Sequence, residues 1–115
     1  MDMDTFETAQ LIDEQDRAKQ DYHEFLRVPS ISAGLYTLPA GSIDMQQPHT
    51  EDEIYYVISG RAAFRGGSEE RSVQAGSIIY VKAHVEHRFH SISEDLRVLV
   101  IFAPAEYTNA STHQE

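Results

Sequence analysis

The chain has 115 residues, no cysteine and a formal net charge of −10 at pH 7. This length predicts one domain, and the absence of cysteine excludes disulfides, zinc–thiolate sites and cysteine nucleophiles. The acidity argues against nucleic acid and membrane surfaces as partners, because both require a basic face. The N-terminus carries no apolar run, and we expect a cytoplasmic protein.

The first part of the chain predicts a short helix over residues 4–19, within an N-terminal extension of residues 1–20. Asp4 followed by Glu7 fits a helix-capping pattern, and no glycine or proline interrupts the segment. The apolar stripe of this helix is modest, so we expect it to lie against the outside of the domain.

From residue 22 onwards, short runs rich in aromatic and β-branched residues alternate with turn residues, a pattern that predicts strands. We expect strands at residues 22–27, 31–38, 53–58, 61–65, 70–74, 77–81, 87–90 and 96–102. Many short strands with no helix between them predict an all-β sandwich or barrel and exclude a parallel α/β sheet. The polar residues 106–115 predict a flexible tail.

The main functional signal lies ahead of the third of these strands. Gln47, His49 and Glu53 are separated by even steps, so in an extended chain their side chains point to one side. An imidazole and a carboxylate that converge on one point are typical metal ligands. Glu53 also opens an otherwise apolar strand, where an unpaired carboxylate would be costly and a cation would remove the cost. We expect the fold to bring His87 to this group.

The residues around this signal resemble the first motif of the cupin family. Gly41, His49, Glu53 and Gly60 occupy the motif positions, with three residues between His49 and Glu53 and six between Glu53 and Gly60. Gln47 stands in the place of the first histidine of the motif.

The second cupin motif is matched at Gly76 and His87. Three of its positions differ, with Lys82, His84 and Ser91 in place of proline, glycine and asparagine. Together, the two motifs cover about the middle half of the chain. They are more specific for fold than for function, because this fold hosts many chemistries.

The resemblance implies an antiparallel double-stranded β-helix, or jelly-roll barrel, formed by residues 1–115 as a single domain. It also implies a homodimer and a divalent metal ion held by His49, Glu53 and His87. This ligand set suits Fe, and it equally suits Zn, Mn or Ni, so the metal stays open. Gln47 would be a weak fourth ligand or would hydrogen-bond a bound water or substrate.

Further pocket residues are assigned by their position on the strands. Tyr55 shares the face of Glu53 and Phe89 shares the face of His87, so we expect both, with Gln47, to line the substrate pocket. Aromatic residues in such positions are more often part of the core than substrate contacts.

Two residues are candidates for proton transfer at the barrel mouth, Glu86 in the loop before the His87 strand and Tyr36 through its hydroxyl group. The plainer interpretation of Glu86 is an exposed loop residue, and that of Tyr36 is a core residue. Glu51 lies in a turn, and we expect it to be a solvated loop acid.

Two functions from different classes fit this sequence. The first is an enzyme, a metal-dependent dioxygenase or isomerase that acts on a small oxygen-bearing metabolite. The alternative is a non-catalytic module that binds or senses a small ligand and acts through a partner protein. A structural domain with a vestigial site is a third interpretation.

Overall fold

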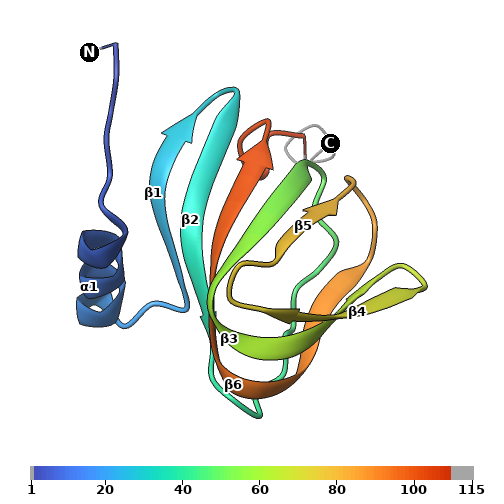
Figure 1. Ribbon diagram of the computed structural model, residues 1–115. Coiled ribbons are helices and arrows are strands. Elements are labelled where there is room, and N and C mark those ends of the chain that lie inside the picture. The colour runs from blue at the N-terminus through green and yellow to red at the C-terminus, as the bar shows by residue number, and fades with distance from the viewer. Residues whose placement is uncertain (1, 110–115) are drawn as a thin grey trace.

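The computed structural model describes residues 2–109, which form one helix and six strands (Figure 1). In chain order the elements are α1 (Thr8–Ala18), β1 (Tyr22–Val28), β2 (Ile31–Leu38), β3 (Asp52–Gly66), β4 (Glu69–Gln74), β5 (Ile78–Val81) and β6 (His87–Ala103). All strand pairings are antiparallel. The predicted all-β class with a short N-terminal helix is therefore confirmed. Within residues 2–109, α1 has 11 residues and is too short to cross a membrane.

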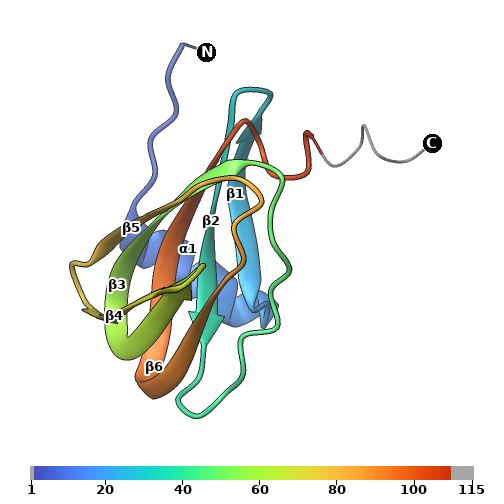
Figure 2. The ribbon, with the colours of Figure 1, turned by 90° about the vertical axis from the view of Figure 1, so that its right-hand side faces the viewer.

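The sheet has the strand order β1-β2-β6-β3-β4, and β5 pairs with β3. The two longest strands, β3 and β6, pair from Asp52 opposite Ala103 to Gly66 opposite His87. Figures 1 and 2 show these two strands curving together, so that the sheet folds over on itself. The concave side of this curved sheet becomes the interior of the barrel.

The structure joins two pairs of strands that the sequence predicts as separate. β3 runs without a break through Ser59 and Gly60, where a turn is expected, and β6 runs through residues 91–95. The β3–β6 register shifts three times between Val57 and Ala63, as expected for β-bulges. The prediction of turns is wrong here because bulges bend the two strands together while their pairing continues.

The core consists of side chains that alternate along the strands and point to the concave side. In β3 this alternation buries Glu53, Tyr55 and Val57 and leaves Ile54 and Tyr56 outside. The other large buried side chains of this cluster are Phe64, Phe89, Leu96, Val98 and Phe102. The inward face of β3 therefore carries one carboxylate at the edge of an otherwise apolar interior.

Helix α1 lies beside β1 and β2 on the outside of the barrel, as predicted (Figure 1). It begins at Thr8 rather than at residue 4, and Glu7 at its N-cap makes no side-chain capping bond. The predicted cap at Asp4 is wrong. Leu11 and Gln15 are the buried residues of the helix, and Gln15 Nε2 donates to the carbonyl of Leu35 at 3.0 Å.

Gly60 stabilises the bend in β3, and its replacement by alanine is expected to destabilise the protein. It has a φ of +101°, and a Cβ atom there would lie 2.3 Å from the carbonyl oxygen of Asp95. The left-handed backbone costs about 1–2 kcal/mol for a residue with a side chain, and the clash with a paired strand adds to it. Gly41→Ala is the matched control, because its φ is +78° but nothing lies within 4 Å of its Cβ position.

Urea unfolding of the two variants measures this difference. We expect Gly60→Ala to lower the free energy of unfolding by clearly more than Gly41→Ala. Equal losses in the two variants would show that the bend does not depend on the close approach of β6.

Candidate metal centre

Three predicted ligand residues meet at one end of the barrel interior. His49 lies in the loop before β3, Glu53 is the second residue of β3, and His87 is the first residue of β6. One ligand atom from each lies within 4.8 Å of the others. The structure thus confirms the predicted convergence, although 34 positions separate residues 53 and 87 in the sequence.

Glu53 is the centre of this cluster. Its Oε1 lies 2.8 Å from His87 Nε2 and 3.2 Å from His49 Nδ1. The carboxylate is nearly inaccessible, with 2% of the residue exposed. Its strand neighbours are Val81 on β5 and Phe102 on β6, so apolar side chains surround it.

The arrangement of the His49, Glu53 and His87 side chains is compatible with a bound cation. His49 Nδ1 and both Glu53 oxygens are buried without a hydrogen-bond partner, so the short contacts around Glu53 lack hydrogen-bond geometry. Buried polar atoms without partners are costly, and a shared cation would satisfy them together. Two imidazoles and one carboxylate can hold a divalent metal ion and leave further coordination positions open.

The two histidines and Glu53 shift one another's protonation. Burial by itself lowers the pKa of His49, but the carboxylates of Glu106 and Glu53 outweigh it and raise this pKa to about 9. Burial similarly opposes the charge on His87, whose pKa is nevertheless raised by Glu53. Burial acts to raise the pKa of Glu53, while the two histidines hold it below its usual value. A cation at this site would therefore compete with protons for the histidine nitrogens.

Hydrogen bonds orient the His87 ring from two sides. Its Nδ1 lies 2.8 Å from the carbonyl oxygen of Val85, which fixes the proton on Nδ1 and leaves Nε2 for a metal. The hydroxyl of Tyr55 lies 3.1 Å from Nε2. This hydroxyl donates its one proton to Gln46 Oε1, at 3.1 Å.

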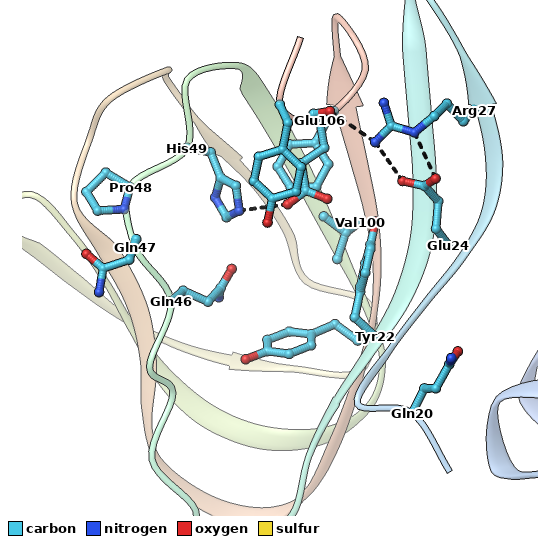
Figure 3. A pocket seen from close by; sticks show the side chains of 13 residues that line it. Gln20, Tyr22, Glu24, Arg27, Gln46, Gln47, Pro48, His49, Val100 and Glu106 are labelled. Atoms are coloured by element: carbon cyan, nitrogen blue, oxygen red, sulfur yellow. Dashed lines mark hydrogen bonds and ion pairs between the residues drawn. The ribbon is translucent and has the colours of Figure 1, made fainter. Parts of the chain in front are cut away.

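A hollow of about 660 Å³ lies beside the cluster and shares His49 and Phe102 with it. Figure 3 shows Tyr22 and Gln46 pointing into this space from opposite walls. The hydroxyl of Tyr22 is buried without a hydrogen-bond partner. Its ring fills the space above Gly34, where a Cβ atom would come within 2.5 Å of it. The Tyr22 hydroxyl therefore packs against Gly34 in the wall of the hollow.

The structure directs Gln46, rather than the predicted Gln47, toward the hollow. Gln47 is exposed and its side chain points away from the hollow, whereas Gln46 points inward and contacts Tyr55 (Figure 3). The prediction assumed the alternation of a strand, but residues 43–49 are irregular and do not follow a period of two. Gln47 lines the outer part of the hollow rather than facing Glu53.

The other assigned residues lie at different depths. Phe89 is fully buried in aromatic contact with Tyr55 and Phe64, and neither Phe89 nor Tyr55 lines the hollow. Tyr36 lines it, but its hydroxyl donates to Asp44 at 2.9 Å. Glu86 is exposed in its loop and does not line the hollow.

Two acidic residues are buried where the sequence predicts solvent exposure or a flexible tail. Glu51, predicted to be solvated, is 1% exposed, and its carboxylate accepts hydrogen bonds from the backbone N–H groups of Tyr107 and Asn109. Glu106, the first residue of the predicted flexible tail, is also buried, and it contacts His49. The rest of that tail beyond residue 109 lies outside the described residues. No local sequence signal marks either contact, because both connect segments more than 50 positions apart.

Comparison with known proteins identifies the family. The cupin domain family pattern matches residues 34–102, and the chain belongs to this family. An uncharacterised protein of Streptomyces coelicolor is 55% identical over 95 residues, which are 81% of this chain and 90% of that protein.

Solved structures share the fold. The protein TT1209 from Thermus thermophilus aligns with a TM-score of 0.72 and 22% identity, covering 90% of this chain and 99% of that one. DMSP lyase DddQ from Ruegeria pomeroyi aligns with a TM-score of 0.62 and 23% identity, covering 66% of this chain. This chain spans only 39% of the length of the lyase chain. At these identities the likeness shows the fold alone.

Metal binding at this centre is expected to strengthen as the pH rises. His49 must lose a proton before its nitrogen can bind a cation, and its pKa of about 9 means that it holds this proton at neutral pH. Each pH unit below 9 should therefore weaken binding about tenfold for every proton displaced. Competition of Zn²⁺ between the protein and a chelator at pH 6, 7 and 8 measures this slope. An affinity that stays constant over this range would contradict the assignment of His49 as a ligand.

Proposed function

We propose that this protein binds a divalent metal ion through His49, Glu53 and His87 and holds a small oxygen-bearing molecule in the adjoining hollow. The observation that carries the proposal is the set of buried atoms of His49 and Glu53 that lack hydrogen-bond partners and face one point. The ligand set allows Fe, Zn, Mn or Ni, and Gln47, which points away, is not included among the ligands.

The chemistry of the hollow supports a ligand with hydroxyl, carbonyl or carboxylate oxygens. Gln46 reaches into it with an amide group that can hydrogen-bond oxygen, and Tyr22 lines its wall. Arg27, the cation on its wall, is already held by Glu24 through two bonds of 2.9 Å. A bound metal ion would add Lewis acidity toward the ligand's oxygens.

The residues that line the hollow offer no strong proton donor. Burial and the nearby carboxylate of Glu106 raise the pKa of Tyr22, so its phenol stays neutral and holds its proton. The two residues predicted for this role are also poorly placed, because the Tyr36 hydroxyl is engaged with Asp44 and Glu86 is exposed. The reaction we favour is a metal-dependent oxygenation or isomerisation.

The second candidate function is a ligand-binding or sensing module without turnover, which acts through a partner. The lining of the hollow favours it, since no residue of the loop 82–86 is among the residues that line it. A mass-spectrometric screen with the metal-loaded protein separates the two: product formation supports the enzyme, and saturable binding without product supports the sensor.

Replacement of His87 tests the metal centre directly. We expect His87→Ala to weaken binding of Zn²⁺ by about 100-fold or more, because one of three ligands is lost and Glu53 keeps only one imidazole neighbour. His90→Ala is the matched control, since His90 lies on the same strand but contacts Glu70 on the outside. Elemental analysis of protein purified without chelator gives the occupancy. Equal metal content in wild type and His87→Ala would exclude the proposed site.

We also propose that the protein forms a homodimer through an apolar face on β3 and β5. Ile54 lies opposite Tyr80, and Tyr56 lies opposite Ile78, on the outward side of the two strands. All four are exposed, Ile78 at 72% and Tyr80 at 62%. Two copies of a chain with a net charge of −10 repel each other, and an uncharged face is where they can approach most closely. A cytoplasmic location stays a prediction.

A charge placed on this face is expected to separate the dimer. Tyr80→Glu should raise the dimer dissociation constant about 100-fold or more, because a carboxylate would be buried against an apolar surface. Ile43→Glu is the control, since Ile43 is equally exposed but lies outside β3 and β5. Analytical ultracentrifugation measures the change. A wild-type protein that sediments as a monomer at all concentrations would refute the dimer.

A further inference from the structure

Glu106 contacts the His49 ring from the side opposite Glu53. Its Oε2 lies 3.1 Å from His49 Nε2 (Figure 3), whereas Glu53 Oε1 lies 3.2 Å from Nδ1. Nδ1 is buried without a hydrogen-bond partner, and Nε2 faces the carboxylate of Glu106. If a neutral His49 carries its proton on Nε2, toward Glu106, the lone pair of Nδ1 lies on the side of Glu53, where a cation shared with Glu53 would bind.

The backbone of Glu106 is held on both sides. Its N–H donates to the hydroxyl of Ser32, which is fully buried, at 2.9 Å. Its carbonyl oxygen accepts from Arg27 Nη2 at 3.0 Å, and Arg27 is itself fixed by the carboxylate of Glu24. The carboxylate of Glu106 is therefore positioned before any ligand binds.

The segment after Glu106 is anchored as well. The buried carboxylate of Glu51 accepts hydrogen bonds from the backbone N–H groups of Tyr107 at 2.9 Å and Asn109 at 2.8 Å. The Tyr107 ring lies near His49, with a centroid separation of 6.5 Å. Contacts from several distant parts of the chain thus converge to hold one short segment against the imidazole.

We propose that Glu106 is a positioning residue of the metal centre. It accepts a hydrogen bond from Nε2–H of His49 and thereby fixes the tautomer and the ring orientation in which Nδ1 can bind the metal. This inference rests on the proposed metal-binding function.

Each histidine would then use one ring nitrogen for a hydrogen bond and the other for the metal. In His87, Nδ1 bonds the Val85 carbonyl and Nε2 is left for the metal. In His49, Nε2 would bond Glu106 and Nδ1 would be left for the metal. A carboxylate is a stronger acceptor than a carbonyl group, so Glu106 makes His49 the more basic ligand. Groups in this position typically contribute a factor of about 10–100 in metal affinity.

The test is Zn²⁺ binding to the full chain, measured by competition with a chelator. We expect Glu106→Ala to weaken binding about 10–100-fold. Glu106→Gln should lose less, because its amide oxygen still accepts a hydrogen bond. Glu94→Ala is the control, since Glu94 is exposed and pairs with Arg61 away from the site; its affinity should equal that of wild type. Thermal unfolding of the metal-free variants verifies that each one folds.

A second readout reports the tautomer itself. In the Zn²⁺-loaded protein labelled with ¹⁵N at histidine, the His49 ring should carry its proton on Nε2, and this proton should exchange faster in Glu106→Ala than in wild type. An affinity unchanged in Glu106→Ala would overturn the proposal, as would a loss as large as that of His49→Ala, which would make Glu106 a ligand. A wild-type protein that binds no Zn²⁺ would instead refute the proposed function itself.

Discussion

The bent pairing of β3 with β6 is the constraint on which the site depends. Glu53 pairs with Phe102 near one end of this ladder, and His87 pairs with Gly66 at the other. In a flat sheet these ends would lie roughly 40 Å apart, yet Glu53 Oε1 is 2.8 Å from His87 Nε2. The register shifts around Gly60 bend both strands at once and bring the two ends together. The fold and the metal centre therefore share one structural cause.

A buried carboxylate at this place imposes an electrostatic condition on the protein. Glu53 is enclosed by apolar strands, so it needs positive charge close by. Protons on the imidazoles are one source of this positive charge, and the raised pKa values of His49 and His87 favour them. A divalent cation is the other way, and it competes with those protons for the same lone pairs.

The parts of the site come from different regions of the sequence. The candidate metal ligands His49, Glu53 and His87 lie within residues 34–102, the range that matches the cupin domain family. Much of the wall of the hollow lies outside it, in Tyr22 on β1 and in Glu106 and Tyr107 after β6. Residues that contact a ligand and residues that hold a metal can therefore change separately, which suits a fold that hosts many chemistries.

The sequence by itself determined the all-β class and the outer helix, and it predicted that His49, Glu53 and His87 converge. These follow from local patterns, since alternation and motif spacing depend on near neighbours along the chain. Only the tertiary structure decided that Gln46 rather than Gln47 points inward, because residues 43–49 are irregular and have no period to read. It also decided the burial of Glu51 and Glu106, whose partners are backbone groups and a histidine more than 50 positions away. Contacts of this kind depend on how the bent sheet closes, and no local pattern of residues encodes that closure.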